Sequence, residues 1–422
     1  MVENIKTSRL SSGLTVITER MPDVRSATLG FWFKKGARDE PADLNGICHF
    51  IEHAVFKGTE KRSALEIAIE TDRLGGNLDA FTSHEETAFV IKAVDKNIGQ
   101  AFDLIADMLV NPRFDERELR RERNVIIEEI KMVEDTPEDH LTELFMSRFF
   151  TKHPLGRPIE GTRRTVRTFK SEIVARFHAD NYTPENLVIT CAGNVRHDEI
   201  VGLAEKFFAG GKRNPKSEIR NPKSTPSILL KKKENLEQTH LIIAFPWISA
   251  DDERRYAASL LTGIFGDGNS SRLWQNIREK RGLAYSVGAG TDSFADCGVF
   301  SIYAGTSPEK LPEVIDLSVK EIRRLKREGV SQDELKLAKQ QTTVSILLGL
   351  ESSAARAEVL AHNEMTHGRQ IPVEETLQRI ESVRAEEIQS LADEFFQTEK
   401  IALAALGNLN GLRVKRNRLD VS

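Results

Sequence analysis

The chain contains an internal repeat, and that repeat limits the folds open to it. A helix opened by Asp115 and Glu118 is matched about 215 residues later by a helix opened by Ser331 and Glu334. Two predicted strands that both end in Gly-Asn are separated by nearly the same distance. With 422 residues, each half is long enough to bury a core of its own. The sequence therefore predicts two similar domains in tandem, each built from both helices and strands.

The segment between the two halves has the composition of a linker. It contains two Asn-Pro pairs, and its other residues are mainly polar or basic. We therefore expect an N-terminal domain at residues 1–210, a linker at residues 211–227 and a C-terminal domain at residues 228–422.

Charge and cysteine usage exclude several classes of protein. The 60 Lys and Arg residues are interspersed with 64 Asp and Glu residues, so we expect no nucleic acid as a partner. The N-terminal stretch lacks the apolar core of a signal peptide and no apolar run of about 18 residues occurs, so we expect no membrane partner and a cytoplasmic location. The three cysteines are too few for a disulfide framework. We expect Cys48 to be a small core residue.

An apolar run at residues 44–56 contains the sequence His49-Phe50-Ile51-Glu52-His53. On a helix, His49 and His53 lie one turn apart on the same face, with Glu52 beside them. Burying these groups is costly unless a partner such as a metal ion compensates. The alternative is that two core histidines fall at this spacing by chance. With all acidic residues counted as Glu, the full pattern of two histidines and one acid is expected roughly 0.04 times in a chain of this composition. The second half has no such motif, so only the first domain can hold this metal ion.

A second helix of the first half carries acidic residues on its inward face. Leu119, Ile126 and Val133 recur every seven residues, and Glu122 and Glu129 occupy inward positions between them. Inward-facing acids need partners. A catalytic zinc ion keeps three protein ligands, and two histidines with one carboxylate are a common set. Glu129 and Glu122 are therefore candidates for the third ligand and a supporting residue, unless either pairs with a core arginine.

The motif His49-x-x-Glu52-His53 resembles the inverted zinc motif of the inverzincins, the insulysin and pitrilysin group of metallopeptidases. In that family the third ligand lies 76 residues after the second histidine, which here is Glu129, and an auxiliary glutamate seven residues earlier corresponds to Glu122. The resemblance implies one Zn²⁺ ion per chain and Glu52 as the general base. It also implies an α+β fold, a tandem of two α/β sandwich domains with mixed, mainly antiparallel sheets covered by helices.

Further segments resemble the short-chain branch of this group, which includes the beta subunit of mitochondrial processing peptidase and its bacterial homologues. They are His153-Pro-Leu-Gly-Arg-Pro158, Gly161-Thr162, Ser271-Arg-Leu273 and Arg278-Glu-Lys-Arg-Gly-Leu-Ala-Tyr285. In that family an Arg and a Tyr from the second type of domain contact the substrate carbonyl, and they match Arg278 and Tyr285. Without the resemblance, Arg278 would be a surface charge on a helix and Tyr285 a half-buried strand residue.

The resemblance also implies where peptide binds. Asp79, Ala80 and Phe81 match the edge strand on which substrate adds as a further β-strand, although the family usually has Asn at the position of Asp79. Asp139 and Glu143 match an acidic pair that processing peptidases use to bind an arginine of the substrate. Two solvated acids on one helix are the alternative for this pair.

Together these features predict a zinc metalloendopeptidase that hydrolyses unfolded or presequence-like oligopeptides inside a clamshell chamber. In the family two such two-domain units close around the chamber, so the resemblance implies a homodimer, or a pair with a non-identical homologous subunit. Two other classes stay open: a noncatalytic or partner-dependent peptide-binding subunit of a processing complex, and a zinc-dependent binding or chaperone module. Turnover of peptides separates the enzyme from both.

Overall fold

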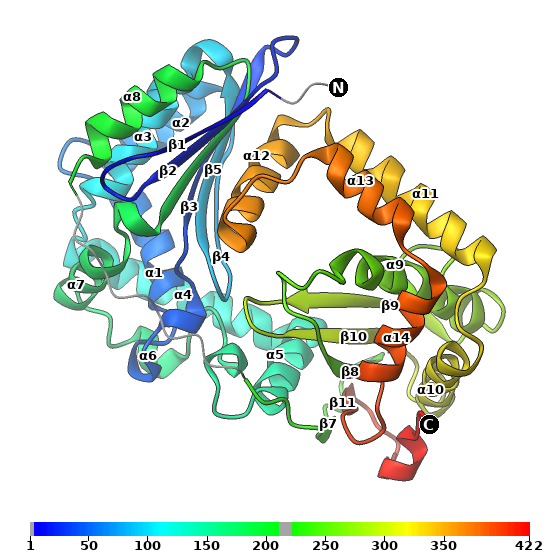
Figure 1. The fold of residues 1–422 in the computed structure, drawn as a ribbon. Coiled ribbons are helices and arrows are strands. Elements are labelled where there is room, and N and C mark those ends of the chain that lie inside the picture. The colour runs from blue at the N-terminus through cyan, green and yellow to red at the C-terminus, as the bar shows by residue number, and fades with distance from the viewer. Residues whose placement is uncertain (1–3, 211–221) are drawn as a thin grey trace. The chain divides into compact units, whose positions relative to one another are not determined.

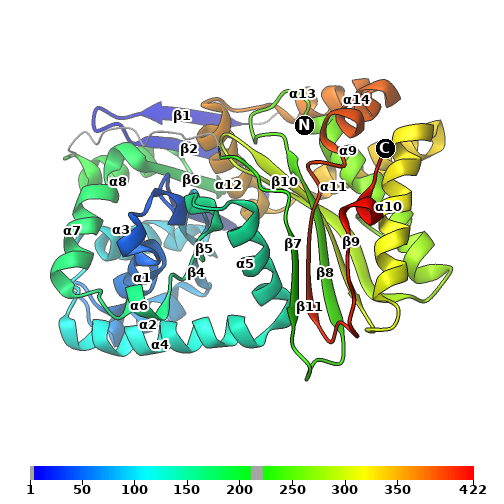
Figure 2. The same cartoon turned by 90° about the horizontal axis from the view of Figure 1, so that it is seen from below.

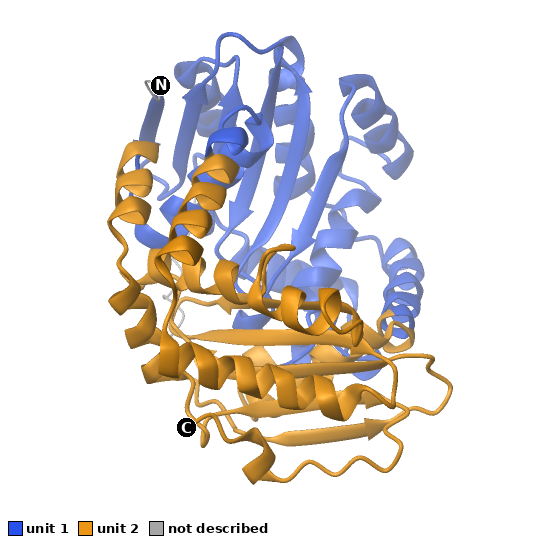
Figure 3. Ribbon diagram, turned by 90° about the vertical axis from the view of Figure 1, so that its right-hand side faces the viewer, with its two compact units in different colours: residues 1–132, 157–218, 347–372 blue, residues 133–156, 219–346, 373–422 orange. Residues whose placement is uncertain are grey.

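The computed structural model describes residues 4–210 and 222–422, which form two compact units (Figure 3). Unit 1 comprises Met1–Met132, Arg157–Glu218 and Leu347–Pro372, and unit 2 comprises Val133–Gly156, Ile219–Ile346 and Val373–Ser422. The units are therefore not the two contiguous halves of the chain. Most of the expected linker, residues 211–221, lies outside the described residues.

The sheet of unit 1 is mixed and mainly antiparallel. Its strands are β1 (Ile5–Arg9), β2 (Thr15–Arg20), β3 (Ser26–Phe33), β4 (Leu78–Thr82), β5 (Thr87–Val94) and β6 (Leu187–Gly193). They lie in the order β1-β2-β6-β3-β5-β4, and β2 and β6 are the parallel pair. Strand β4 is thus an edge strand: one side pairs with β5, and no strand of the described residues pairs with its other side.

The sheet of unit 2 repeats this topology. Its strands are β7 (Ile228–Lys232), β8 (Thr239–Trp247), β9 (Ala284–Ser293), β10 (Gly298–Thr306) and β11 (Ala402–Gly407). Their order, β7-β11-β8-β10-β9, corresponds strand for strand to β2-β6-β3-β5-β4, and the parallel pair falls at the equivalent place. The prediction of two similar α+β domains in tandem is confirmed.

Helices cover both sheets. Those of unit 1 are α1 (Ile47–Ala54), α2 (Ala64–Leu74), α3 (Ile98–Val110), α4 (Glu116–Asp135, which ends beyond the unit boundary), α6 (Arg163–Val166), α7 (Ser171–Asn181), α8 (His197–Phe208) and α12 (Ser353–His362). Those of unit 2 are α5 (Pro137–Phe149), α9 (Arg255–Gly266), α10 (Leu311–Glu328), α11 (Gln332–Gly349, which ends beyond the unit boundary), α13 (Val373–Ser382) and α14 (Ala385–Phe395). No helix among the described residues is both long and apolar enough to cross a membrane.

The central strands of each sheet are buried on both faces because one helix from the other half of the chain covers the second face of the sheet. In unit 1, α3 and α8 lie on one side and α12 on the other (Figure 1). In unit 2, α5 packs on β8 and β11, opposite α9 and α10 (Figure 2). Strand β3 is accordingly buried along nearly its whole length. This exchange of helices explains why the compact units differ from the contiguous halves.

The sequence alone predicts one long strand at Phe81–Val94 and a solvated, frayed tail at the basic C-terminal residues Arg413, Lys415, Arg416 and Arg418, and both expectations are wrong. The segment Phe81–Val94 is not one long strand, because Ser83 turns the chain between β4 and β5: its N–H donates to Glu86 O (2.8 Å) and its Oγ accepts from the N–H groups of Glu85 and Glu86. The basic C-terminal segment is not a frayed tail. Leu419 is fully buried there, and apolar anchoring of this kind is not visible from charge alone.

A buried ion pair attaches α12 to the sheet of unit 1. Arg356 Nε lies 2.6 Å from Glu19 Oε2, and both side chains are almost fully buried. Around the pair, Ala357 and Leu360 pack on Trp32. The pair therefore carries charge inside an otherwise apolar contact, where losing one partner is costly.

Replacing Arg356 with Met should lower the free energy of unfolding of unit 1 by about 3 kcal/mol, because it leaves the Glu19 carboxylate buried without its partner. Urea unfolding followed by circular dichroism measures this. Arg176→Met, which removes an exposed arginine of the same unit, should change stability by less than about 0.5 kcal/mol. The double variant Glu19→Gln/Arg356→Met should recover part of the loss, and equal stability of Arg356→Met and wild type would contradict this account.

Candidate metal centre

Helix α1 is set in place at both ends by backbone features. It begins after Gly46, which has a φ of +94°. Glu160 O lies so close that a Cβ on residue 46 would be only 2.5 Å from it, so both the conformation and the space require glycine. The buried Glu40 carboxylate accepts hydrogen bonds from Gly46 N (2.7 Å) and Cys48 N (2.8 Å). Burial raises the pKa of Glu40 to about 7, against the lowering effect of these donors. A short 3₁₀ turn follows the helix, and Gly58 ends it with a φ of +119°.

The predicted inward acids of α4 face α1. Glu122 is buried, whereas Glu128 on the opposite side of α4 has 69% of its side chain exposed. Glu129, two turns after Glu122, is partly buried. The amphipathic period of α4 therefore identified the correct face, and neither acid has an arginine among its ion pairs in the described residues.

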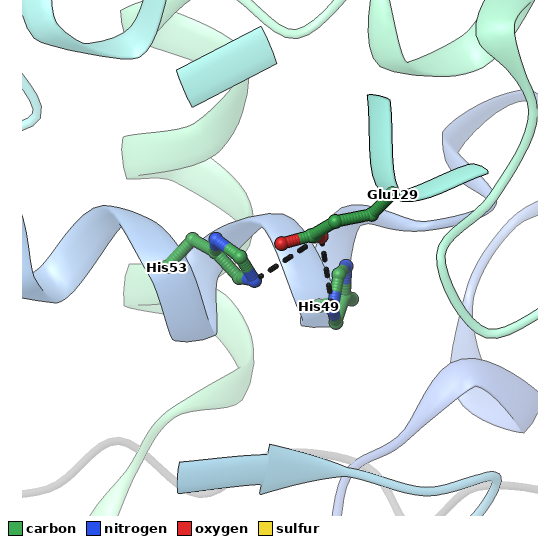
Figure 4. Close-up of side chains that lie close together, drawn as sticks. All are labelled: His49, His53 and Glu129. Atoms are coloured by element: carbon green, nitrogen blue, oxygen red, sulfur yellow. Dashed lines mark ion pairs between the residues drawn. The ribbon is translucent and has the colours of Figure 1, made fainter. Parts of the chain in front are cut away.

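His49, His53 and Glu129 converge on one point (Figure 4). Glu129 Oε2 lies 3.9 Å from His49 Nε2 and 3.6 Å from His53 Nε2, and one ligand atom from each residue falls within 4.8 Å of the others. Two ligands of a tetrahedral zinc ion are about 3.4 Å apart. The spacing is therefore too long for hydrogen bonds and close to what a shared ion requires. Among the described residues, no other group of three or more His, Cys, Asp or Glu side chains brings its ligand atoms within 4.8 Å of one another.

The chemistry of the donor atoms also fits a metal ion. Glu129 Oε2 is buried and has no hydrogen-bond partner among the described residues. Burial, and next the neighbouring His53, lower the pKa of His49 to about 3, so its imidazole is neutral and keeps a lone pair. Burial also raises the pKa of Glu129. A cation would supply the partner that these groups lack.

His53 is oriented by Glu122. Its Nδ1 lies 2.9 Å from Glu122 Oε1, and burial of Glu122 is outweighed by hydrogen bonds from His53 and Lys57, which lower the pKa of the carboxyl group. Because an ionised carboxylate only accepts hydrogen bonds, Nδ1 carries a proton, and in the neutral imidazole the lone pair is therefore on Nε2, toward Glu129. Burial lowers the pKa of His53, but the Glu122 hydrogen bond and nearby acids raise it overall.

Glu52 lies beside the three candidate ligands but is not one of them. Its carboxylate is buried, and Oε2 accepts a hydrogen bond of 2.7 Å from Thr82 Oγ1 at the end of β4. Burial raises the pKa of Glu52, while the Thr82 hydrogen bond and His53 lower it in part. A buried carboxylate with a raised pKa next to a metal centre is suited to accept and donate a proton.

The predicted peptide-binding residues lie on the edge strand. Ala80 faces the core that contains α1, and Asp79 and the side chain of Phe81 are exposed. Phe81 contacts Trp32, with ring centroids 6.0 Å apart. The same strand therefore provides an edge of the sheet and, through Thr82, the hydrogen bond to Glu52.

Arg278 and Tyr285 lie in unit 2, where both line a pocket of about 500 Å³. The Arg278 guanidinium lies 3.9 Å from the ring centroid of Trp274 and 5.6 Å from that of Tyr285. The expectation that Tyr285 is half-buried was wrong, since 74% of it is exposed. An exposed tyrosine at this place in β9 is available to a ligand.

Asp139 and Glu143 also lie in unit 2, one turn apart on α5 as predicted. Asp139 is exposed and Glu143 is half-buried. Their spacing is compatible with binding a guanidinium group and equally with two surface acids.

Sequence reasoning missed three residues that position the centre: Glu40, Lys57 and Thr82. Lys57 Nζ lies 2.8 Å from Glu122 Oε2. The signal for Lys57 was its position four residues after His53, which puts both on one side of the helix. Glu40 and Thr82 had no such signal, because a loop and a strand bring them to α1 from elsewhere.

Curated relatives of similar length match almost the entire chain. An uncharacterized zinc protease of Streptomyces coelicolor is 36% identical over 98% of this chain and 92% of its own length. An uncharacterized zinc protease of Bacillus subtilis is 37% identical over 95% of this chain and 98% of its own.

Solved structures share the fold. A protease from Helicobacter pylori has a TM-score of 0.88 at 22% identity and covers 96% of this chain and 100% of its own. A structure from Pseudomonas fluorescens described as a peptidase M16 inactive domain has a TM-score of 0.89 at 21% identity, over 96% and 98%. A chain of complex III from Candida albicans has a TM-score of 0.86 at 22% identity, over 98% and 99%.

Family models match both halves. The insulinase model, peptidase family M16, matches residues 15–163, which contain the candidate metal centre. The model of the peptidase M16 inactive domain matches residues 168–342, which begin near the end of the first half and continue into the half that lacks the motif. With relatives above 35% identity along nearly its full length, the chain belongs to the insulinase family, peptidase family M16.

Proposed function

We propose that this protein is a zinc metalloendopeptidase. The observation that carries the proposal is the convergence of His49, His53 and Glu129 on one point, with the buried Glu52 beside them. The relatives are named as zinc proteases, and this supports the proposal. His49, His53 and Glu129 would hold one Zn²⁺ ion per chain.

The residues of α1 and α4 divide the work of hydrolysis. When bound, zinc supplies a Lewis acid that lowers the pKa of water and polarises a carbonyl group. Glu52 accepts the proton of the attacking water and delivers it to the amine nitrogen that leaves when the peptide bond breaks. Thr82 keeps the Glu52 carboxylate oriented through its 2.7 Å hydrogen bond. Glu122 keeps His53 in the tautomer that binds metal.

We propose unfolded or presequence-like oligopeptides as substrates. An extended peptide adds to the available edge of β4 by backbone hydrogen bonds, so Asp79, Ala80 and Phe81 bind its main chain and select neighbouring side chains. Because Thr82 of the same strand contacts Glu52, this register brings the peptide to the catalytic base. Asp139 and Glu143 are the proposed acidic pair for a substrate arginine.

Arg278 and Tyr285 are proposed to stabilise the oxyanion that forms on the scissile carbonyl. A single donor of this kind contributes about 3 kcal/mol to transition-state stabilisation. We further propose a homodimer that encloses a chamber, in which each zinc site uses the Arg278 and Tyr285 of the partner copy. The exposure of Tyr285 in its pocket is compatible with this role.

A noncatalytic or partner-dependent peptide-binding subunit is the alternative. The match of residues 168–342 to the domain described as inactive, and the likeness to a chain of complex III, favour it. Against it stands the full set of candidate ligands together with Glu52 in the first half.

Glu52→Gln should abolish hydrolysis of an unstructured, Arg-containing peptide of about 15 to 20 residues while keeping zinc, because it removes the base and no ligand. We expect a loss of at least about 100-fold in kcat. Mass spectrometry of the products and zinc analysis of both proteins measure the two effects. No cleavage by zinc-loaded wild type would favour the noncatalytic alternative.

Glu129→Gln should weaken zinc binding by more than about 100-fold, since replacing a direct ligand costs more than replacing an outer partner. Its neighbour Glu128, which is exposed and pairs with Lys131, provides the matched control. Competition with a zinc chelator measures both dissociation constants. Equal affinities of Glu129→Gln and Glu128→Gln would contradict the proposed ligand set.

Mixing inactive Glu52→Gln chains with inactive Tyr285→Phe chains should restore about a quarter of wild-type activity. Random pairing makes half of the dimers mixed, and each mixed dimer has one intact site of two. As a control, Glu52→Gln mixed with Glu52→Gln/Tyr285→Phe should stay inactive. An active wild type whose mixed variants regain nothing would indicate that each site is contained in one chain.

A further inference from the structure

We propose that Lys57 is a positioning residue of the metal centre: it fixes the Glu122 carboxylate, which in turn orients His53 for zinc. This inference rests on the proposed function, since it concerns how tightly the same centre binds its ion. Lys57 is not among the candidate ligands and acts only through Glu122.

The contacts form a chain of three groups. Glu122 Oε1 accepts from His53 Nδ1 at 2.9 Å, and Oε2 of the same carboxylate lies 2.8 Å from Lys57 Nζ. Only 5% of the Glu122 side chain is exposed, against 32% of Lys57. One buried carboxylate of α4 is thus bound by two side chains that lie four residues apart along α1 and the turn that follows it.

The two oxygens of Glu122 need two donors. A buried carboxylate with one oxygen unpaired loses the free energy of that missing contact and gains freedom to rotate about its side-chain torsions. The ammonium group of Lys57 supplies the second donor and a compensating charge.

The contact between Lys57 and Glu122 bears on His53 and not on His49, the other candidate imidazole ligand. His49 Nδ1 is buried and has no hydrogen-bond partner among the described residues, so the ring of His49 is not oriented in this way. Of the two candidate imidazole ligands, His53 is the one with an outer partner, and that partner is Glu122. Outer partners of this type contribute about 10–100-fold to metal affinity.

A simple stabilising role for the Lys57–Glu122 pair makes a different prediction. A second Lys–Glu pair, Lys131–Glu128, has both of its residues on α4. Its N–O distance is 2.6 Å, but it lies on the exposed face of that helix. If Lys57 merely stabilised the fold, its loss would lower the unfolding midpoint and leave the zinc dissociation constant unchanged.

The test is chelator competition for Zn²⁺ with the full chain, comparing wild type, Lys57→Met, Lys57→Arg and Lys131→Met. We expect Lys57→Met to weaken zinc binding by about tenfold or more, Lys131→Met to leave it unchanged, and Lys57→Arg to restore most of the affinity, because arginine also pairs with a carboxylate. Unfolding midpoints are recorded alongside.

A double-variant cycle decides whether Lys57 acts through Glu122. We expect Lys57→Met/Glu122→Gln to bind zinc no more weakly than Glu122→Gln alone, because the residue on which Lys57 acts is already changed. Additive losses would overturn the inference. If the wild type binds zinc and cleaves peptide, an unchanged zinc affinity of Lys57→Met would overturn it as well. A wild type that binds no zinc would overturn the proposed function and this inference together.

Discussion

The burial of ionisable groups between α1 and α4 is the constraint on which the metal centre depends. Two histidines and three glutamates are buried or partly buried there, and burying an ionisable group is costly unless it is compensated. Glu122 is compensated by His53 and Lys57, and Glu52 by Thr82. The remaining lone pairs meet around Glu129 Oε2, which has no hydrogen-bond partner in the described part of the chain. A bound cation would compensate these groups.

The surrounding fold positions helix α1. Glu40 caps the first turn of α1 from a loop, and Gly46 permits the close approach of the chain at Glu160. Strand β4 lies next to α1, so the residue that contacts Glu52 and the available sheet edge belong to one element. The same backbone that would bind an extended peptide therefore also orients the base.

The two units use one topology with different results. Their sheets share strand order and the position of the parallel pair, yet only unit 1 carries the candidate ligands. Each unit also takes a helix from the opposite half of the chain, α12 in unit 1 and α5 in unit 2. A contiguous half would leave an apolar sheet face uncovered, which gives a physical reason for the exchange.

The sequence by itself determined the tandem repeat, the helix that carries His49 and His53, and the inward face of α4, because hydrophobic period and capping are local properties of the chain. It also identified Glu122 and Glu129, since an acid on an inward face needs a partner. Only the tertiary structure decided which atoms meet. The Thr82 hydrogen bond and the exchanged helices depend on segments distant in sequence, and no local pattern encodes such contacts.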